Sequence, residues 1–287
     1  MLAVGSLSIG LAVFASASTV SQSCPGGFSA CPMFAAGCCK GIAPDAYRVQ
    51  GGFGCALDAS PYDLGQCAAG GRNASAGTCC CAPGPDPSEI STTLPNVLVI
   101  GDSVSAGYTP ALRAALSGKA NVQHGPDNAG GGNADGVGYG ALCAGFFART
   151  PKYRTIAWDV ITFNFGLHDG ATANDVYRTN LTTVHALVRD AAPTAKLVYI
   201  LTTVPDMGSP GNLQDQKVQQ LNSIAKEVMD TGAGSNSSAV TVVDLHATML
   251  TCGDACKSCA PHCGPDGYQY LVDHALAPAV KAAINSS

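Results

Sequence analysis

Nine of the chain's 14 cysteines lie between Cys24 and Cys81, and this uneven distribution divides the sequence into two parts. Disulfide bonds persist in oxidising compartments, so a cysteine content this high predicts an exported, disulfide-bonded protein. Residues 24–81 show no periodic apolar pattern that would build a core, and a unit of this size relies on disulfides instead. We therefore expect a small cysteine-rich module at residues 24–81.

A proline-rich segment separates this module from the rest of the chain. Residues 82–95 include Pro83-Gly84-Pro85-Asp86-Pro87, a composition typical of a stiff spacer, and we expect them to form a linker. Only 12% of all residues are charged and the net charge is −5. The chain has no basic face, which excludes nucleic acids and anionic membrane surfaces as partners.

The N-terminus has the pattern of a secretory signal peptide at residues 1–17. Leu2 to Val13 are mostly apolar and are followed by Ala15-Ser16-Ala17, a small-x-small cleavage pattern. The stretch is shorter than the ~20 apolar residues of a spanning helix, so an uncleaved anchor is the less favoured alternative and no stable membrane span is expected. A secreted location is expected, and four Asn-x-Ser/Thr sequons suit a glycoprotein: Asn73, Asn180, Asn236 and Asn285.

After the linker, short apolar runs alternate with helical patterns. Asn96–Ile100 is a β-rich run typical of a strand buried on both faces. Further strands are expected at 121–124, 159–165, 196–201 and 239–243, and helices at 109–116, 174–191, 213–229 and 268–284. This alternation predicts an α/β domain at residues 96–285, a three-layer sandwich with a parallel sheet covered on both faces.

The triplet Gly101-Asp102-Ser103 follows the first expected strand and precedes a helical pattern. In open α/β sheets, ligands bind at the carboxyl ends of the strands. A helix N-terminus at that edge supplies N–H groups and a positive dipole end, which favour a developing oxyanion. Ser103 is therefore the predicted nucleophile. The competing interpretation is that Asp102 and Ser103 only cap the helix.

Gly101-Asp102-Ser103, with the following Val104-Ser105-Ala106-Gly107-Tyr108, resembles the first signature block of the SGNH/GDS hydrolases. The resemblance covers residues 96–285. It implies a flavodoxin-like fold with a five-stranded parallel sheet and a serine-dependent ester hydrolase. It also implies a Ser-His-Asp type site that uses no metal and no other cofactor.

The same resemblance implies an oxyanion hole built from three signature blocks. The N–H of Ser103 is the first donor. The second block matches residues 127–132, where Gly130 is the implied donor and Gly131 is the neighbouring alternative.

The third block matches residues 163–169, and here His168 stands where the family has asparagine. A neutral imidazole carries one N–H donor, so His168 can fill the asparagine's role. The sequence Gly-Leu-His-Asp is similar to one branch of the superfamily. Asp169 is a candidate for fixing the tautomer of His168.

The fifth block implies that His262 is the general base, because residues 262–268 fit the family's spacing from the histidine onward. His262 would accept the proton of Ser103 during attack and return it to the leaving alkoxide. His274, inside the last expected helix, is a weaker candidate for the base. His246 has the position of a structural residue after a strand.

The acid of the site is harder to place. The family has aspartate three residues before the histidine, and this chain has Cys259 there. Asp254 and Asp266 are the nearest carboxylates, upstream and downstream, and are the candidates for orienting His262. Without an acid, a Ser-His dyad would rely on a backbone carbonyl, and loss of the third member of a triad costs about four orders of magnitude in turnover.

Four cysteines surround the expected base: Cys252, Cys256, Cys259 and Cys263. Their spacing permits a zinc site, but export favours two disulfides. Two such bridges would hold the His262 loop where an aspartate normally helps to do so. Nine cysteines in the module and five beyond it also require at least one bridge between the two regions if all 14 pair within the chain, and Cys143 is its simplest member.

These features together predict a secreted serine esterase that hydrolyses carboxylic esters through an acyl-enzyme. Small acyl groups on extracellular carbohydrate are the favoured substrate, and the module is expected to bind a polysaccharide or matrix. Lipid ester and thioester substrates remain open. The alternative is a catalytically impaired carbohydrate- or matrix-binding protein with the same fold, motivated by Cys259 at the aspartate position and His168 at the asparagine position.

Overall fold

The structure is a computed structural model that describes residues 28–30, 38–40, 60–63, 78–81, 85, 87–125, 134, 136–148, 156–231 and 239–286. Its largest part is a sheet of five parallel strands in the order β6-β5-β7-β8-β9. The strands are β5 (Asn96–Ile100), β6 (Asn121–Gly125), β7 (Val160–Phe163), β8 (Lys196–Ile200) and β9 (Thr241–Val243). This strand order is that of a flavodoxin-like sheet and confirms the predicted fold class.

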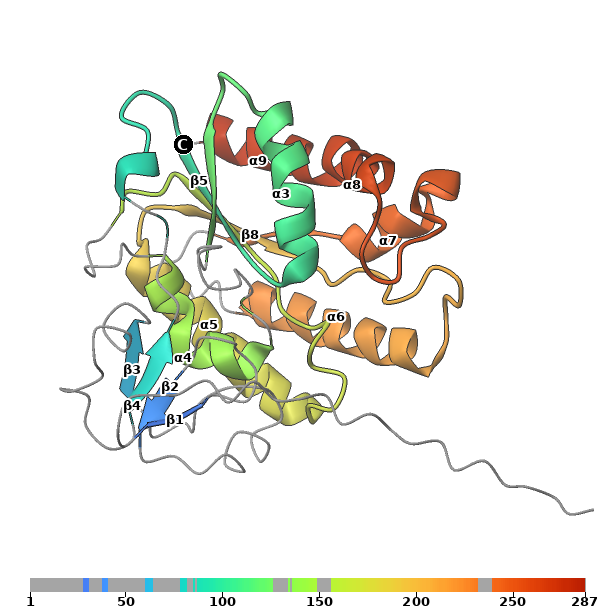
Figure 1. Cartoon of the computed structure of the whole chain (residues 1–287), viewed down its shortest axis with the longest axis horizontal. Helices are drawn as coiled ribbons and strands as arrows, with labels where there is room; N and C mark the ends of the chain where they lie inside the picture. The colour runs from blue at the N-terminus through green and yellow to red at the C-terminus, as the bar shows by residue number, and fades with distance from the viewer. Residues whose placement is uncertain are drawn as a thin grey trace, which may run out of the picture.

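Helices cover both faces of the sheet, so the three-layer prediction is also confirmed (Figure 1). Helices α4 (Val137–Phe147), α5 (Asn174–Ala191) and α6 (Leu213–Thr231) lie on one face. The other face carries α3 (Ser103–Ala115), α7 (Leu245–Leu250), α8 (Pro265–Leu271), the π-helical η4 (Val272–Leu276) and α9 (Ala277–Asn285).

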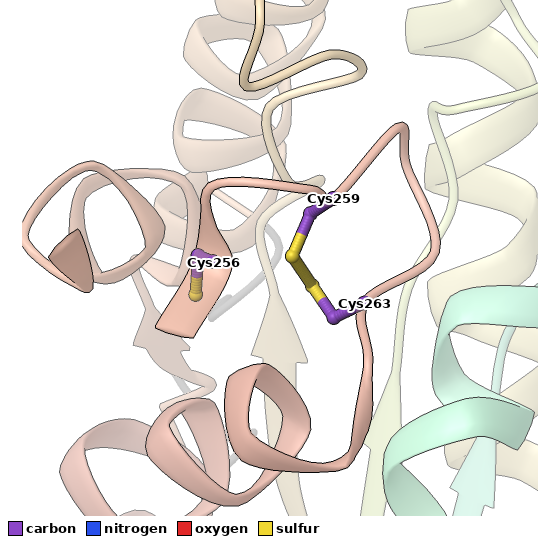
Figure 2. Close-up of side chains that lie close together, drawn as sticks. All are labelled: Cys256, Cys259 and Cys263. Carbon is purple, nitrogen blue, oxygen red and sulfur yellow. A yellow bond between two sulfur atoms is a disulfide. The ribbon is translucent and has the colours of Figure 1, made fainter. Parts of the chain in front are cut away.

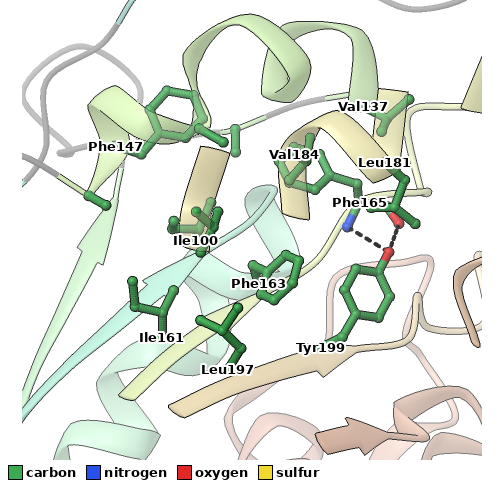
Figure 3. Packing of buried hydrophobic residues seen from close by; sticks show 14 of the residues in the cluster. Ile100, Val137, Phe147, Ile161, Phe163, Phe165, Leu181, Val184, Leu197 and Tyr199 are labelled. Atoms are coloured by element: carbon green, nitrogen blue, oxygen red, sulfur yellow. Dashed lines mark hydrogen bonds between the residues drawn. The ribbon is translucent and has the colours of Figure 1, made fainter. Parts of the chain in front are cut away.

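Strand β5 explains why each face has its own core. Leu98 and Ile100 pack with the first set of helices, whereas Val97 and Val99 pack with the second set. All four side chains are fully buried. Alternate side chains of a strand point to opposite faces of the sheet. When helices cover both faces, every position is buried, and the sequence of the strand is therefore a continuous run of apolar residues. Figure 3 shows the first core, in which Ile100 and Phe163 lie among residues of α4 and α5.

Helix α4 is absent from the sequence prediction. Its sequence, Val-Gly-Tyr-Gly-Ala-Leu-Cys-Ala-Gly-Phe-Phe, is apolar on all sides and therefore shows no amphipathic period. The structure packs it closely against its neighbours. A Cβ at Gly140 would lie 2.5 Å from the ring of Phe165, so the glycine permits the close approach of the helix.

The last expected helix also differs from the prediction. A single helix at 268–284 is expected, but the structure begins at Pro265 and inserts the π-helical turn η4 before α9. Pro278 lies in the first turn of α9 and has no N–H to offer to a preceding carbonyl. The change of helix type therefore coincides with the residue that cannot continue regular α-helical bonding.

A second, four-stranded sheet lies in the cysteine-rich region. Its strands are β1 (Phe28–Ala30), β2 (Cys38–Lys40), β3 (Ser60–Asp63) and β4 (Thr78–Cys81), in the order β1-β2-β4-β3. Strands β3 and β4 contact α4 (Figure 1).

The buried Cys143 on α4 is disulfide-bonded. The four later cysteines pair with one another, so its partner lies among the nine cysteines of residues 24–81. The predicted bridge between the two regions is confirmed.

The second half of the expected linker is fixed to the edge of the large sheet. The short helix η1 (Pro87–Glu89) lies beside β6, and the Glu89 carbonyl accepts hydrogen bonds from Asn121 Nδ2 at 2.7 Å and Gln123 Nε2 at 3.1 Å. These bonds attach residues next to the module directly to the domain that contains the five-stranded sheet.

Two observations bear on the expected export. Asn180, one of the four sequon residues, is only 3% exposed on α5, so the folded domain leaves no room for a glycan there. Asn285 is exposed, and Asn73 and Asn236 lie outside the described residues. Over the part of the chain that the structure describes, no helix combines the length and apolarity needed to cross a membrane.

Candidate active site

Ser103 is the first residue of α3 and stands directly beyond the carboxyl end of β5. Asp102 is the N-cap of the helix, and its buried carboxylate accepts the Val104 N–H at 2.9 Å. A Cβ at Gly101 would lie 2.7 Å from Ser105 Oγ, so the turn needs glycine at that position. The capping interpretation is thus correct for Asp102, while the hydroxyl of Ser103 remains available for another partner.

That partner is His262, which is 159 residues away in the sequence. His262 Nε2 lies 2.7 Å from Ser103 Oγ, and the imidazole is exposed to solvent. In serine hydrolases the nucleophile and its general base lie within hydrogen-bond distance of each other, and Ser103 and His262 have this geometry. The structure therefore brings together the two residues that the sequence predicted as nucleophile and base.

The start of α8 determines where the His262 loop lies. A Cβ at Gly107, on α3, would overlap the hydroxyl and ring carbons of Tyr268, so these two helices touch at that point. Gly107 belongs to the first signature block and Tyr268 to the fifth. The contact explains why position 107 is a glycine, since only glycine leaves space for the Tyr268 ring.

Neither of the predicted acids reaches His262. Asp254 lies in the short helix η3 (Gly253–Cys256) and Asp266 in the first turn of α8, and both are exposed. No described carboxylate forms an ion pair with His262. In the described part of the molecule, Ser103 and His262 therefore form a dyad without an orienting acid.

The four cysteines near His262 form two disulfides, as predicted, and the structure gives their pairing, which the sequence left open, as Cys252–Cys256 and Cys259–Cys263. Among the described residues, one group of side chains has metal-binding spacing, namely Cys256, Cys259 and Cys263. Figure 2 shows the bond between Cys259 and Cys263 with Cys256 beside it. Sulfur atoms in disulfides are not thiolates and so do not offer the ligands that zinc requires.

The third block follows β7, the strand paired with β5 in the sheet. Because both strands are parallel, the turn carrying His168 leaves the same edge of the sheet as Ser103. Both carboxylate oxygens of Asp169 accept the Val137 N–H, each at 3.1 Å, so Asp169 joins this turn to the start of α4. Gly130 and Gly131, the expected glycine donors of the oxyanion hole, lie outside the described residues.

Three hydroxyl groups fix the backbone of this turn. The Phe165 carbonyl accepts hydrogen bonds from Tyr177 at 2.8 Å, Tyr199 at 2.9 Å and Thr202 at 3.1 Å. Burial raises the pKa of both phenols, so both remain protonated donors. Figure 3 shows the Tyr199 hydroxyl pointing at Phe165. No local pattern predicts this cluster, because its members come from three separate segments of the chain: Phe165 after β7, Tyr177 in α5, and Tyr199 with Thr202 at the end of β8.

A second serine-histidine contact lies behind the nucleophile and was also missed. Ser105 Oγ donates to the Asp102 carbonyl at 2.6 Å and lies 2.7 Å from His124 Nε2. Since the serine proton is already used, the imidazole must be the donor in the second bond. His124 is the last residue but one of β6, and its position near a strand end was the available signal. The pair ties β6 to the turn that carries Ser103.

The other candidate histidines lie away from Ser103. His246, on α7, is buried and its Nε2 lies 2.7 Å from Asp215 Oδ1 of α6. His274 is exposed in η4 and packs against the ring of Tyr270, with centroids 4.1 Å apart. The structural role predicted for His246 agrees with these contacts.

The sequence matches the GDSL-like Lipase/Acylhydrolase family over residues 99–270. No sequence among the curated proteins matches the chain. Solved structures with similar folds include a putative GDSL-like lipase from Bacteroides ovatus (11% identity, TM-score 0.49), where the match covers 67% of this chain and 54% of that one, so the chain spans about half of that protein.

Two further similar structures are matched over almost their whole length. A lipase/acylhydrolase from Enterococcus faecalis is 15% identical, with a TM-score of 0.49 and coverage of 66% of this chain and 96% of that one. A carbohydrate esterase of family 3 from Talaromyces cellulolyticus is 17% identical, with a TM-score of 0.47 and coverage of 68% and 100%. Similarities of this size carry no information about substrate. The family match spans more than half of the sequence, and this chain therefore belongs to the GDSL-like lipase/acylhydrolase family and is a hydrolase acting on ester bonds.

Proposed function

We propose that this protein is a secreted serine esterase that removes small acyl groups, such as acetyl, from extracellular carbohydrate. The observation that carries the catalytic part of the proposal is the 2.7 Å distance between Ser103 Oγ and His262 Nε2. A base within hydrogen-bond distance of a serine hydroxyl is the geometry that activates the serine as a nucleophile.

In the proposed reaction, Ser103 Oγ attacks the acyl carbon while His262 Nε2 takes the hydroxyl proton. The tetrahedral intermediate collapses, and His262 returns the proton to the leaving alkoxide, which departs as the alcohol. Water then attacks the acyl-enzyme with His262 again acting as the base, and the acid product and free Ser103 are regenerated.

The negative charge on the intermediate requires donors at the edge of the sheet. We assign this role to the Ser103 N–H, the Gly130 N–H and the His168 ring. The position of Ser103 at the N-terminus of α3 supports the first assignment, because the first N–H groups of a helix have no partner within the helix. The sequence resemblance supports the other two.

The small acyl group is supported by the exposed surface. Of the described large apolar side chains, only Leu213 and Leu250 are exposed, at 84% and 49%. A site for long acyl chains needs a sizeable apolar surface, which two separate leucines do not provide. Carbohydrate as the carrier, binding of a polysaccharide or matrix by the cysteine-rich module, and secretion are inferred from the cysteine content and the signal-peptide pattern.

Ester hydrolysis by the full chain tests this proposal. The substrates are p-nitrophenyl acetate, butyrate and octanoate, together with acetylated xylan. Ser103→Ala and His262→Ala are the test variants, and His274→Ala is the matched control because His274 is an exposed histidine away from Ser103. We expect activity that is highest on acetate, is lost in both test variants and is retained in the control. A wild type no faster than Ser103→Ala on every ester would favour the carbohydrate- or matrix-binding alternative.

A further inference from the structure

We propose that the Cys259–Cys263 disulfide is the positioning element for His262, at the place in the chain where the family has a carboxylate. The proposal rests on the proposed function, since it concerns how the base of that site is held. Its starting point is that His262 contacts Ser103 and yet pairs with no described carboxylate.

The disulfide encloses the base within a very short loop. Cys259 and Cys263 are four positions apart, and His262 directly precedes the second of them. Closing a loop this short leaves its backbone few conformations. By restricting the backbone at His262, the bridge limits the directions in which the imidazole can point.

The bridge is itself anchored to the rest of the domain. Cys259 is fully buried in the core that includes α3 and α8, and its carbonyl accepts the Met207 N–H at 2.9 Å. A Cβ at Gly267 would lie 2.9 Å from Cβ of Cys263 and 3.4 Å from Sγ of Cys259, so α8 packs directly against the disulfide. The loop thus takes its position from the same helix that touches α3.

The second disulfide provides a matched control. Cys252–Cys256 also joins residues four positions apart, and both of its cysteines are buried. Its loop does not contain His262. Loss of either bridge should therefore lower the stability of the fold by a similar amount, whereas only loss of Cys259–Cys263 should release the base.

Both cysteines of a bridge must be replaced together. The sulfur atoms of Cys256, Cys259 and Cys263 all lie within 4.8 Å of one another. In a Cys252→Ala single variant, the Cys256 thiolate could attack either sulfur of the other bridge, form a new disulfide and release the remaining sulfur as a thiolate. Alanine is preferred because three of the four positions are buried and Cys263 is partly buried, so that a serine hydroxyl would lose solvent without gaining a partner.

The first experiment compares Cys259→Ala/Cys263→Ala with Cys252→Ala/Cys256→Ala on p-nitrophenyl acetate. We expect the first variant to lose about 10²-fold in kcat with little change in KM, because misplacing a catalytic group by about 1 Å has an effect of this size. We expect the control to stay within about threefold of the wild type. Equal losses in the two variants, at temperatures where circular dichroism shows both folded, would overturn the proposal.

A rescue variant separates positioning from stability. Cys259→Asp/Cys263→Ala places a carboxylate three residues before His262, at the family's position. We expect it to regain at least about tenfold in kcat over the double alanine variant, since an oriented acid is worth up to about four orders of magnitude in triads. Turnover no higher than that of the double alanine variant contradicts the proposal.

Two readouts keep the proposal testable if variants fold poorly or if the wild type lacks esterase activity. The first readout is graded treatment of the wild type with a thiol reductant, with mass mapping of the bridges that open. Activity should fall in step with the opening of Cys259–Cys263, and full activity with that bridge open refutes the positioning role.

The second readout is a crystal structure of Cys259→Ala/Cys263→Ala, which gives the distance between His262 Nε2 and Ser103 Oγ without any substrate. A distance still near that of the wild type overturns this proposal, whereas an inactive wild type overturns only the proposed function.

Discussion

The phenol of Tyr268 occupies the space that any side chain at position 107 would need. This relationship connects the helix that begins at the nucleophile with the helix that begins just after the base. The atoms that a Cβ at Gly107 would meet are the hydroxyl and ring carbons of Tyr268, so the rigid ring would have to turn away as a whole to make room.

Gly107→Ala should therefore disturb both the fold and the site. We expect a loss of about 1–3 kcal/mol in the free energy of unfolding, the usual cost of overpacking, together with a lower kcat because α8 must shift. Urea unfolding and ester hydrolysis measure the two effects. Gly170→Ala is the control, since a Cβ at Gly170 meets nothing within 4 Å. Adding Tyr268→Ala should remove most of the clash, and strictly additive losses would show that the two residues do not interact.

Asp215 should make stability depend on acid pH. Burial alone raises the pKa of Asp215, but hydrogen bonds from His246 and the Gly211 N–H outweigh burial and hold the pKa below its ordinary value of 3.8. A carboxyl group with a lowered pKa stabilises the fold above the unfolded-state pKa, and this contribution is lost as the pH falls through the folded-state pKa.

We therefore expect Asp215→Asn to be about 2 kcal/mol less stable than the wild type at pH 7, because it removes a charge-assisted hydrogen bond. The difference should shrink as the pH is lowered below about 4. Urea unfolding between pH 3 and pH 7 gives both quantities. Asp230→Asn, an exposed carboxylate near the end of the same helix, should change little. A wild-type advantage that grows on acidification would contradict the assignment.

The hydroxyl cluster on the Phe165 carbonyl should tolerate the loss of one member. A carbonyl oxygen has two lone pairs and here receives three donors, so Tyr177→Phe should cost only about 1 kcal/mol in the free energy of unfolding. Tyr177→Phe/Tyr199→Phe leaves Thr202 as the remaining donor and should cost more than that. Thermal unfolding and kcat for the two variants test this. A kcat unaffected by the double change would mean that the cluster stabilises the core without positioning the His168 turn.

His168 should contribute through an N–H directed at the oxyanion. His168→Ala is expected to lower kcat by about 10²–10³-fold, the typical effect of losing one such donor. His168→Asn restores the residue type of the family and should retain much more activity than the alanine variant. Steady-state kinetics on p-nitrophenyl acetate distinguishes the two. If both variants lose activity equally, imidazole has a role other than hydrogen-bond donation.

The parts of this protein that the sequence predicted are those with local patterns. Four of the five strands of the large sheet are short runs of mostly apolar or β-branched residues, and β6 (Asn-Val-Gln-His-Gly) is the polar exception. Ser103 and His262 were found because short blocks surround them. Even α5 was placed at its observed bounds, since its apolar residues recur with a helical period.

The missed features are those whose reason lies in a distant segment. Helix α4 has no polar face because it is enclosed between α5 and the cysteine-rich region. The Ser105–His124 bond and the hydroxyls on Phe165 depend on which strand ends are neighbours in the sheet, and spacing along the chain does not show this. The prediction of an acid partner for His262 failed for the same reason. Asp254 and Asp266 are close to His262 in the sequence, but both are exposed to solvent in the fold.

The disulfide of Cys143 gives the cysteine-rich module a mechanical connection to the side of the site on which His168 lies. Helix α4 is held at its first residue by Asp169, next to His168, and two turns later by a covalent bond to the module. A fragment beginning at Asn96 would lose that tether and leave a buried thiol inside the helix. The module is consequently not an interchangeable cassette, because exchanging it for another unit would require a new partner for Cys143.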